Sequence, residues 1–154
     1  MRSSPRTKAM SRPRVLVVDD EPAICQAFAL LLARHGFDVH TEQNRQATHA
    51  FLTEHRVDVL VLDLRLRDSA PGDVIFQEAV SRDPSIRART LFITGDISLE
   101  ARARIVACRC PYLIKPFDAQ LLVDAVNALC ATGTMMGPDT GTTAEPPSAS
   151  TVAA

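Results

Sequence analysis

Several side chains with ionisable or hydroxyl groups stand directly after short apolar runs of the sequence: Asp19, Asp20, Asp63, Thr94 and Lys115. Carboxylates held close together repel each other and raise one another's pKa unless a cation lies between them. Hard oxygen ligands with open coordination positions suit Mg²⁺, which keeps several of its waters and prefers phosphate partners. If the fold brings these groups together, they form a site for a divalent metal and a phosphoryl group.

The stretch 57–63 is the element around which the others are expected to arrange. It is apolar and β-branched on both alternating faces and ends in an acid, Asp63. Such a run is typical of a strand buried between two layers, hence of a parallel sheet with helices on each side. Asp63 then lies at the carboxyl end of the strand, where open α/β sheets bind their ligands. Taken alone, Asp63 is equally compatible with the cap of a loop.

The other elements favour the sheet. We expect further strands at 14–18, 37–41, 90–94 and 112–114. Helices are expected from Pro22 to a stop at Gly36, from an Asn44 cap to about His55, over 74–81, from a Ser98 cap over 99–107, and after Asp118. The first of these helices should bury Ile24, Phe28, Leu31 and Leu32. The second should bury Ala47, Ala50 and Phe51. Strict strand–helix alternation predicts a doubly wound α/β fold with all carboxyl strand ends at one edge.

Length and composition set the broad class. The chain has 154 residues, 46% hydrophobic and 23% charged, which is typical of one ordinary globular domain. A net charge of −1 gives no general attraction to nucleic acid or anionic lipid. The four cysteines form no CxxC pair and suggest a reduced, cytoplasmic protein. No apolar run approaches the roughly 18 residues of a membrane span.

Both ends of the chain differ in composition from the middle. Residues 1–12 are basic and polar with no apolar segment of a signal peptide, so we expect a disordered leader. Residues 132–154 hold six Thr, three Gly and three Pro and no Lys or Arg, which predicts a disordered low-complexity tail. The folded domain is therefore expected over residues 13–131.

Four motifs together resemble the receiver domain of bacterial two-component response regulators. They are VLVVDDE (15–21), VLVLD (59–63), LFITGD (91–96) and YLIKPF (112–117), in the order and at the spacing of that family. Each motif alone is weak, whereas all four in order are a strong signal. The resemblance covers roughly residues 13–131 and implies a flavodoxin-like five-stranded parallel sheet of order 2-1-3-4-5 with helices on both faces.

The resemblance also implies a role for each polar residue. Asp63 would be the phosphoacceptor, taking a phosphoryl group from a histidine kinase or a histidine phosphotransfer protein. Asp20, Asp63 and the backbone carbonyl of Arg65 would bind Mg²⁺, with Asp19 acting through a water. Lys115 would neutralise a phosphoryl oxygen, and its peptide bond to Pro116 is cis in the family.

Thr94 and Tyr112 match the family's switch pair. Phosphorylation would draw Thr94 inward and let the Tyr112 ring follow, which would reshape the surface of the fourth helix, fifth strand and fifth helix for a downstream protein target. No enzymatic activity is implied beyond self-catalysed phosphorylation and dephosphorylation.

The loop after Asp63 departs from the family pattern. Arg67 stands where the family often has Pro, and Gly72 comes one residue late, which predicts an insertion and an unusual course. We also predict that Arg65 and Asp96 approach each other and shield the phosphoryl group from water.

The motifs fit three other classes of protein less well. An aspartate-nucleophile phosphatase on a related α/β fold is the main alternative, but it has a DxD nucleophile where this chain has adjacent Asp19 and Asp20. A flavodoxin needs a Ser/Thr/Gly-rich phosphate loop, where this chain has three acids. A transcription factor needs a DNA-binding domain, for which the tail gives no signal. A stand-alone receiver that contacts proteins, without nucleic acid or membrane, is favoured.

Overall fold

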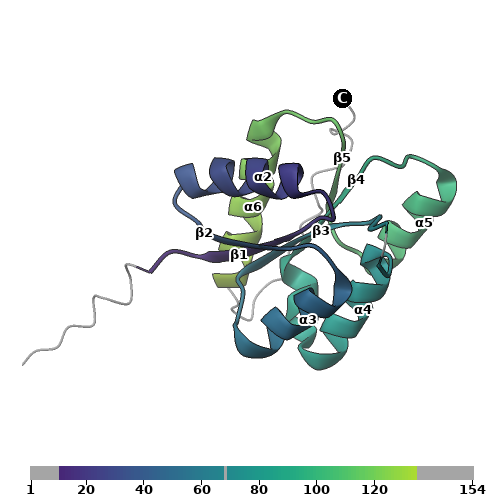
Figure 1. Ribbon diagram of the computed structural model, residues 1–154, viewed down its shortest axis with the longest axis horizontal. Helices are drawn as coiled ribbons and strands as arrows, with labels where there is room; N and C mark the ends of the chain where they lie inside the picture. Colours follow the sequence, from purple (N-terminus) through teal and green to yellow (C-terminus); the bar gives the residue numbers. More distant parts are fainter. Residues whose placement is uncertain (1–10, 68, 135–154) are drawn as a thin grey trace, which may run out of the picture.

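The fold is built on a five-stranded parallel sheet of order β2-β1-β3-β4-β5 (Figure 1), which confirms the predicted topology. The computed structural model describes residues 11–67 and 69–134. The strands are β1 (Arg14–Val18), β2 (Asp38–Glu42), β3 (Val59–Asp63), β4 (Thr90–Thr94) and β5 (Tyr112–Ile114).

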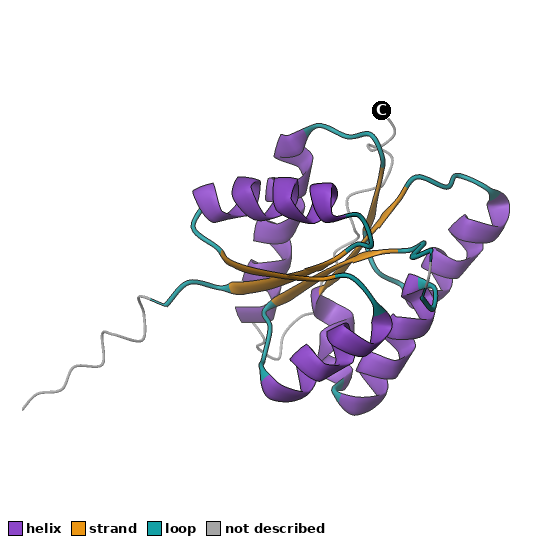
Figure 2. Ribbon diagram, viewed as in Figure 1, coloured by secondary structure: helices purple, strands orange, loops and turns teal. Residues whose placement is uncertain are grey.

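Helices cover both faces of the sheet (Figure 2). On one face lie α2 (Pro22–Arg34) and α6 (Ala119–Thr134), and on the other lie α3 (Arg45–Glu54), α4 (Gly72–Arg82) and α5 (Leu99–Cys108). Alternate strand residues enter the two resulting cores: Val59 and Val61 pack with α2 and α6, whereas Leu60 and Leu62 pack with the other three helices. All five residues of β3 are buried for this reason, as its continuous apolar run predicts.

The predicted helix boundaries rest on local hydrogen bonds. The side chains of Asn44 and Ser98 accept from the backbone N–H groups of Ala47 and Ala101, so both predicted caps are confirmed. Gly36 follows α2 with φ of +89°, a left-handed conformation that favours glycine and ends the helix.

The predicted inner face of α3 is wrong at one position. Ala50 is exposed and Thr48 is fully buried. Thr48 tolerates burial because its hydroxyl donates to the carbonyl oxygen of Asn44 at 2.8 Å, which leaves no polar atom unpaired. Cys25 is likewise a buried residue of α2 that the expected apolar face omitted.

The segment between α4 and β4 holds an element that the periodicity did not predict. It is a 3-10 helix, η1 (Pro84–Arg89), which begins where Asp83 accepts from the N–H of Ser85. At the other end of the domain, α6 continues to Thr134, three residues past the expected boundary. Residues 1–10 and 135–154, most of the expected leader and tail, lie outside the described residues. Of the helices described, none has the length and hydropathy needed to cross a bilayer.

Candidate functional site

Three carboxylates meet at the carboxyl end of the sheet. Asp19 and Asp20 follow β1 and Asp63 ends β3, and the parallel pairing of these strands, with Val18 opposite Leu62, brings the acids together. One oxygen from each carboxylate lies within 4.8 Å of the others. Asp19 and Asp63 are buried, while Asp20 is partly open to solvent. The convergence predicted from the strand order is thus present.

Lys115, directly after β5, supplies the positive charge in this cluster. Its Nζ lies 3.2 Å from Asp63 Oδ2 and 3.3 Å from Asp19 Oδ2. Burial opposes the charged amine, but the two carboxylates more than offset it, so the pKa of Lys115 is raised and the side chain stays protonated. The Lys115–Pro116 peptide bond is cis, as the resemblance implies.

Asp63 is the most perturbed acid of the cluster. Burial is the main reason that its pKa is raised to about 6, with Asp19 adding to the effect. The backbone N–H of Arg65, which donates to Asp63 Oδ1 at 3.0 Å, and the charge of Lys115 act in the opposite direction. Asp63 therefore changes its charge close to physiological pH.

Neither Thr94 nor Tyr112 is among the residues that line the pocket above the acids. Thr94 is buried at the end of β4, and its hydroxyl oxygen accepts from the N–H of Asp96 at 2.9 Å. Tyr112 begins β5 opposite Phe92 and is half-buried against the core. The two residues thus stand on neighbouring strands.

Arg67 is a member of the site that the sequence did not assign. Its backbone N–H donates to Asp20 Oδ2 at 2.9 Å, its Nε lies 3.9 Å from the same oxygen, and its Nη2 lies 3.7 Å from Glu21 Oε2. The only signal in the sequence was the unusual residue type at this position. An arginine of the loop therefore balances the acids on the solvent side, as Lys115 does on the buried side.

The opening above the acids is a pocket of about 780 Å³ lined by residues at the ends of four strands and in the loops that follow them: Asp20, Glu21, Asp63, Arg65, Leu66, Arg67, Gly95, Asp96 and Lys115. Across it, Arg65 Nη2 lies 3.8 Å from Asp96 Oδ2. The predicted approach of Arg65 and Asp96 is confirmed, with both side chains at the edge of the pocket.

Gly72 closes the loop that follows Asp63. Its N–H donates to the carbonyl oxygen of Leu64 at 2.8 Å, and a Cβ built here would overlap the carbonyl oxygen of Asp63 and lie 2.9 Å from Leu64 Cα. Only glycine fits so close to the backbone of the acceptor strand. Its position fixes where the loop after β3 returns to the domain.

The donor set fits a hard divalent cation. Carboxylate oxygens are the ligands that Mg²⁺ prefers, and the solvent-exposed side of Asp20 leaves room for the waters that this ion retains. Both oxygens of Asp19 already have partners, the N–H of Glu21 at 2.9 Å and Lys115 at 3.3 Å. Both oxygens of Asp63 are likewise hydrogen-bonded, to the N–H of Arg65 and to Lys115, and Asp20 is the most exposed of the three acids.

The chain is similar to known proteins in both sequence and structure. A family model described as the response regulator receiver domain matches residues 15–127. The transcriptional regulatory protein TrcR of Mycobacterium tuberculosis is 33% identical over 117 residues, which cover 75% of this chain and 44% of that protein. The transcriptional regulatory protein FixJ of Rhizobium meliloti is 30% identical over 115 residues, which cover 73% of this chain and 54% of that protein. The chain thus spans about half the length of these relatives.

Solved structures share the fold at low sequence identity. A CheY-like response regulator receiver domain protein from Methanospirillum hungatei has a TM-score of 0.75 and 22% identity, covering 82% of this chain and 100% of that one. The signal receiver domain of an HD domain-containing protein from Pseudomonas fluorescens has a TM-score of 0.73 and 24% identity, and the match covers 80% of this chain and 98% of that one.

Proposed function

Since this chain belongs to the response regulator receiver domain family, we propose that Asp63 accepts a phosphoryl group from a phosphohistidine of a histidine kinase or a histidine phosphotransfer protein. The observation that carries the proposal is the position of Asp63. Its carboxylate ends the central strand between Lys115 and the N–H of Arg65, beside two further acids, and faces an open pocket. The domain then acts as a signalling module rather than as an enzyme on a separate substrate.

The transfer is a nucleophilic substitution at phosphorus. A carboxylate oxygen of Asp63 forms a bond to phosphorus, the bond from phosphorus to the histidine nitrogen breaks, and its electron pair returns to the histidine ring. With a pKa of about 6, Asp63 is mostly ionised at neutral pH and available as the nucleophile. Lys115, 3.2 Å from Asp63, stabilises negative charge on the phosphoryl oxygens.

We assign Asp20, Asp63 and the backbone carbonyl of Arg65 as ligands of Mg²⁺, with Asp19 acting through a water. When bound, the ion supplies positive charge against the carboxylates and the phosphoryl oxygens. The three carboxylates within 4.8 Å of one another support this assignment, because their mutual repulsion favours a cation between them.

The signal would pass through Thr94 and Tyr112 to a protein-binding surface on α5, β5 and α6. A phosphoryl group on Asp63 offers acceptor oxygens, to which the Thr94 hydroxyl can donate in place of its present 3.4 Å bond to the carbonyl oxygen of Asp96. On the proposed surface, Leu99 and Val106 of α5 are exposed by 81% and 67%, and Ile97, just before α5, is exposed by 66%. Leu99 and Val106 are seven residues apart and so share one face of the helix, and exposed apolar side chains on a shared face are typical of a protein-contact site.

Mass spectrometry after incubation with acetyl phosphate and Mg²⁺ tests the acceptor. The wild type should gain the mass of one phosphoryl group, and Asp63→Asn should gain none. Asp118→Asn, which removes an exposed acid at the start of α6, serves as the matched control and should behave as the wild type. Equal labelling of Asp63→Asn and the wild type would show that another residue is the acceptor.

A further inference from the structure

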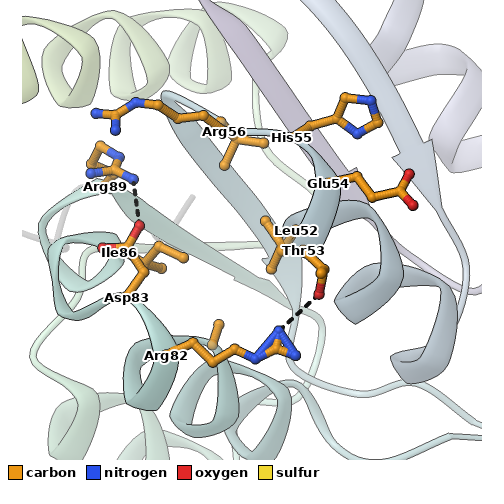
Figure 3. Close-up of a pocket in the computed structure, with 11 residues that line it drawn as sticks. Leu52, Thr53, Glu54, His55, Arg56, Arg82, Asp83, Ile86 and Arg89 are labelled. Carbon is orange, nitrogen blue, oxygen red and sulfur yellow. Dashed lines mark hydrogen bonds and ion pairs between the residues drawn. The ribbon is translucent and has the colours of Figure 1, made fainter.

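A second pocket lies at the end of the sheet opposite to the acidic site (Figure 3). It has a volume of about 310 Å³ and lies between the ends of α3 and α4, η1, and the segment that enters β3. Its apolar lining is Leu52, Val57, Ala79 and Ile86. Because Val57 precedes β3 and Asp63 ends it, the two pockets are separated by the length of this strand.

Arg89, at the end of η1, places a buried positive charge at this pocket. The residue is 7% exposed, and its Nη1 donates to the carbonyl oxygen and the hydroxyl of Ser85. Its Nη2 forms an ion pair with Asp83 Oδ2 at 3.7 Å, while Asp83 Oδ1 accepts two bonds from Ser85. Within the described part of the chain, Arg89 Nε has no hydrogen-bond partner. The protein therefore neutralises this guanidinium incompletely.

A second guanidinium adds to the charge at the same end of the pocket. Figure 3 shows the Arg56 side chain reaching the Arg89 guanidinium, while Glu54 points away from both. Burial lowers the pKa of Arg89, and the neighbouring charge of Arg56 lowers it further. Arg56 itself forms no ion pair with any residue in the described ranges. The carboxylates of Asp83 and Asp58 offset part of this positive charge. Because Arg89 Nε still lacks an acceptor in the described residues, the two guanidinium groups can hold a further anion between them.

We propose that this pocket binds a small organic phosphate, with its phosphate group at Arg56 and Arg89 and its apolar part on the lining of Leu52, Val57 and Ile86. Planar guanidinium groups match phosphate oxygens with paired, charge-assisted hydrogen bonds. A volume of about 310 Å³ is at the lower end of the range of small-molecule sites and suits a body the size of a phenyl ring. The site uses none of the residues assigned to phosphoryl transfer.

Phenyl phosphate is the probe, titrated into ¹⁵N-labelled protein without Mg²⁺, so that the acidic cluster repels it. Saturable chemical-shift changes should appear at the amides of Arg56, Val57, Ile86 and Arg89. Phenol, which lacks the anion, and inorganic phosphate, which lacks the apolar part, should each bind more weakly than phenyl phosphate. Equal binding of either, or shift changes centred on Asp63 and Lys115, would overturn the proposal.

The variant Arg56→Gln removes the positive charge of Arg56 and leaves the buried Arg89 side chain in place. The Kd for phenyl phosphate should rise about tenfold, as expected for the loss of a charge-assisted contact. Arg102→Gln removes an equal charge from the exposed face of α5 and should leave the Kd unchanged. An unchanged Kd in Arg56→Gln, in a variant whose spectrum is otherwise that of the wild type, would refute the site.

Discussion

At Asp63, burial shifts the pKa from the ordinary value of 3.8 to about 6, so folding and protonation are linked at this residue. Between these two values the folded protein holds a proton that the unfolded chain releases. The free energy of unfolding should therefore fall as pH rises from about 4 to 6 and stay reduced above that.

Asp63→Asn removes this effect. In EDTA, the variant should have a higher Tm than the wild type at pH 7.5, and the difference should shrink toward pH 4. Thermal unfolding across this pH range measures it. Mg²⁺ should raise the Tm of the wild type more than that of the variant, because the ion loses one of its proposed ligands. A Tm difference independent of pH would contradict the shifted pKa.

Arg67 acts on the same acids from the solvent side. Its guanidinium lies 3.9 Å from Asp20, a proposed ligand of Mg²⁺, so the two cations compete for that carboxylate. Arg67→Gln should bind Mg²⁺ roughly two- to fivefold more tightly, the size expected of an exposed ion pair. Isothermal titration calorimetry gives the Kd, with Arg102→Gln as the charge-matched control. Weaker binding in Arg67→Gln would mean that the side chain supports the ion instead.

Arg65 and Asp96, 3.8 Å apart, span the pocket above the acceptor. If this pair shields the phosphoryl group from water, Arg65→Ala should shorten the lifetime of phosphorylated Asp63 several-fold. The decay of the phosphorylated mass after removal of acetyl phosphate measures that lifetime. An unchanged decay rate would show that the pair does not protect the phosphoryl group.

The connection between β3 and α4 depends on Gly72. A methyl group here meets the backbone of Asp63 and Leu64, which cannot move aside without shifting the acceptor strand. Gly72→Ala should lower the free energy of unfolding by about 1–3 kcal/mol, the usual cost of overpacking a buried position. Urea unfolding measures this loss. Gly95→Ala is the control, because its Cβ would lie an ordinary 3.9 Å from Lys115 and should change stability little.

At the scale of the whole molecule, the proposed switch can be followed by intrinsic fluorescence. The chain has one tyrosine and no tryptophan, so its intrinsic fluorescence comes from Tyr112 alone. Acetyl phosphate with Mg²⁺ should change this emission in the wild type and not in Asp63→Asn. In Thr94→Ala, Asp63 should still gain the phosphoryl mass, while the change in Tyr112 emission should be much smaller. If the emission of Thr94→Ala changes as much as that of the wild type, Tyr112 responds to phosphorylation independently of Thr94.

The order of the strands and helices, and the acids and lysine of the site, could be predicted from the local pattern of residue types. Continuous apolar runs must be buried on both sides, and parallel strands necessarily bring their carboxyl ends to one edge, so Asp19, Asp20, Asp63 and Lys115 were predictable as a group. Local rules also located the caps at Asn44 and Ser98.

Contacts that leave no periodic signal in the sequence could not be predicted and are seen only in the folded protein. The course of an irregular loop brings Arg67 onto Asp20 and Gly72 onto the backbone of Asp63. The packing of separate elements likewise places Arg56 beside Arg89 (Figure 3). Such contacts join residues from different segments of the chain. They follow from how the segments pack in three dimensions, which the local spacing of residue types does not encode.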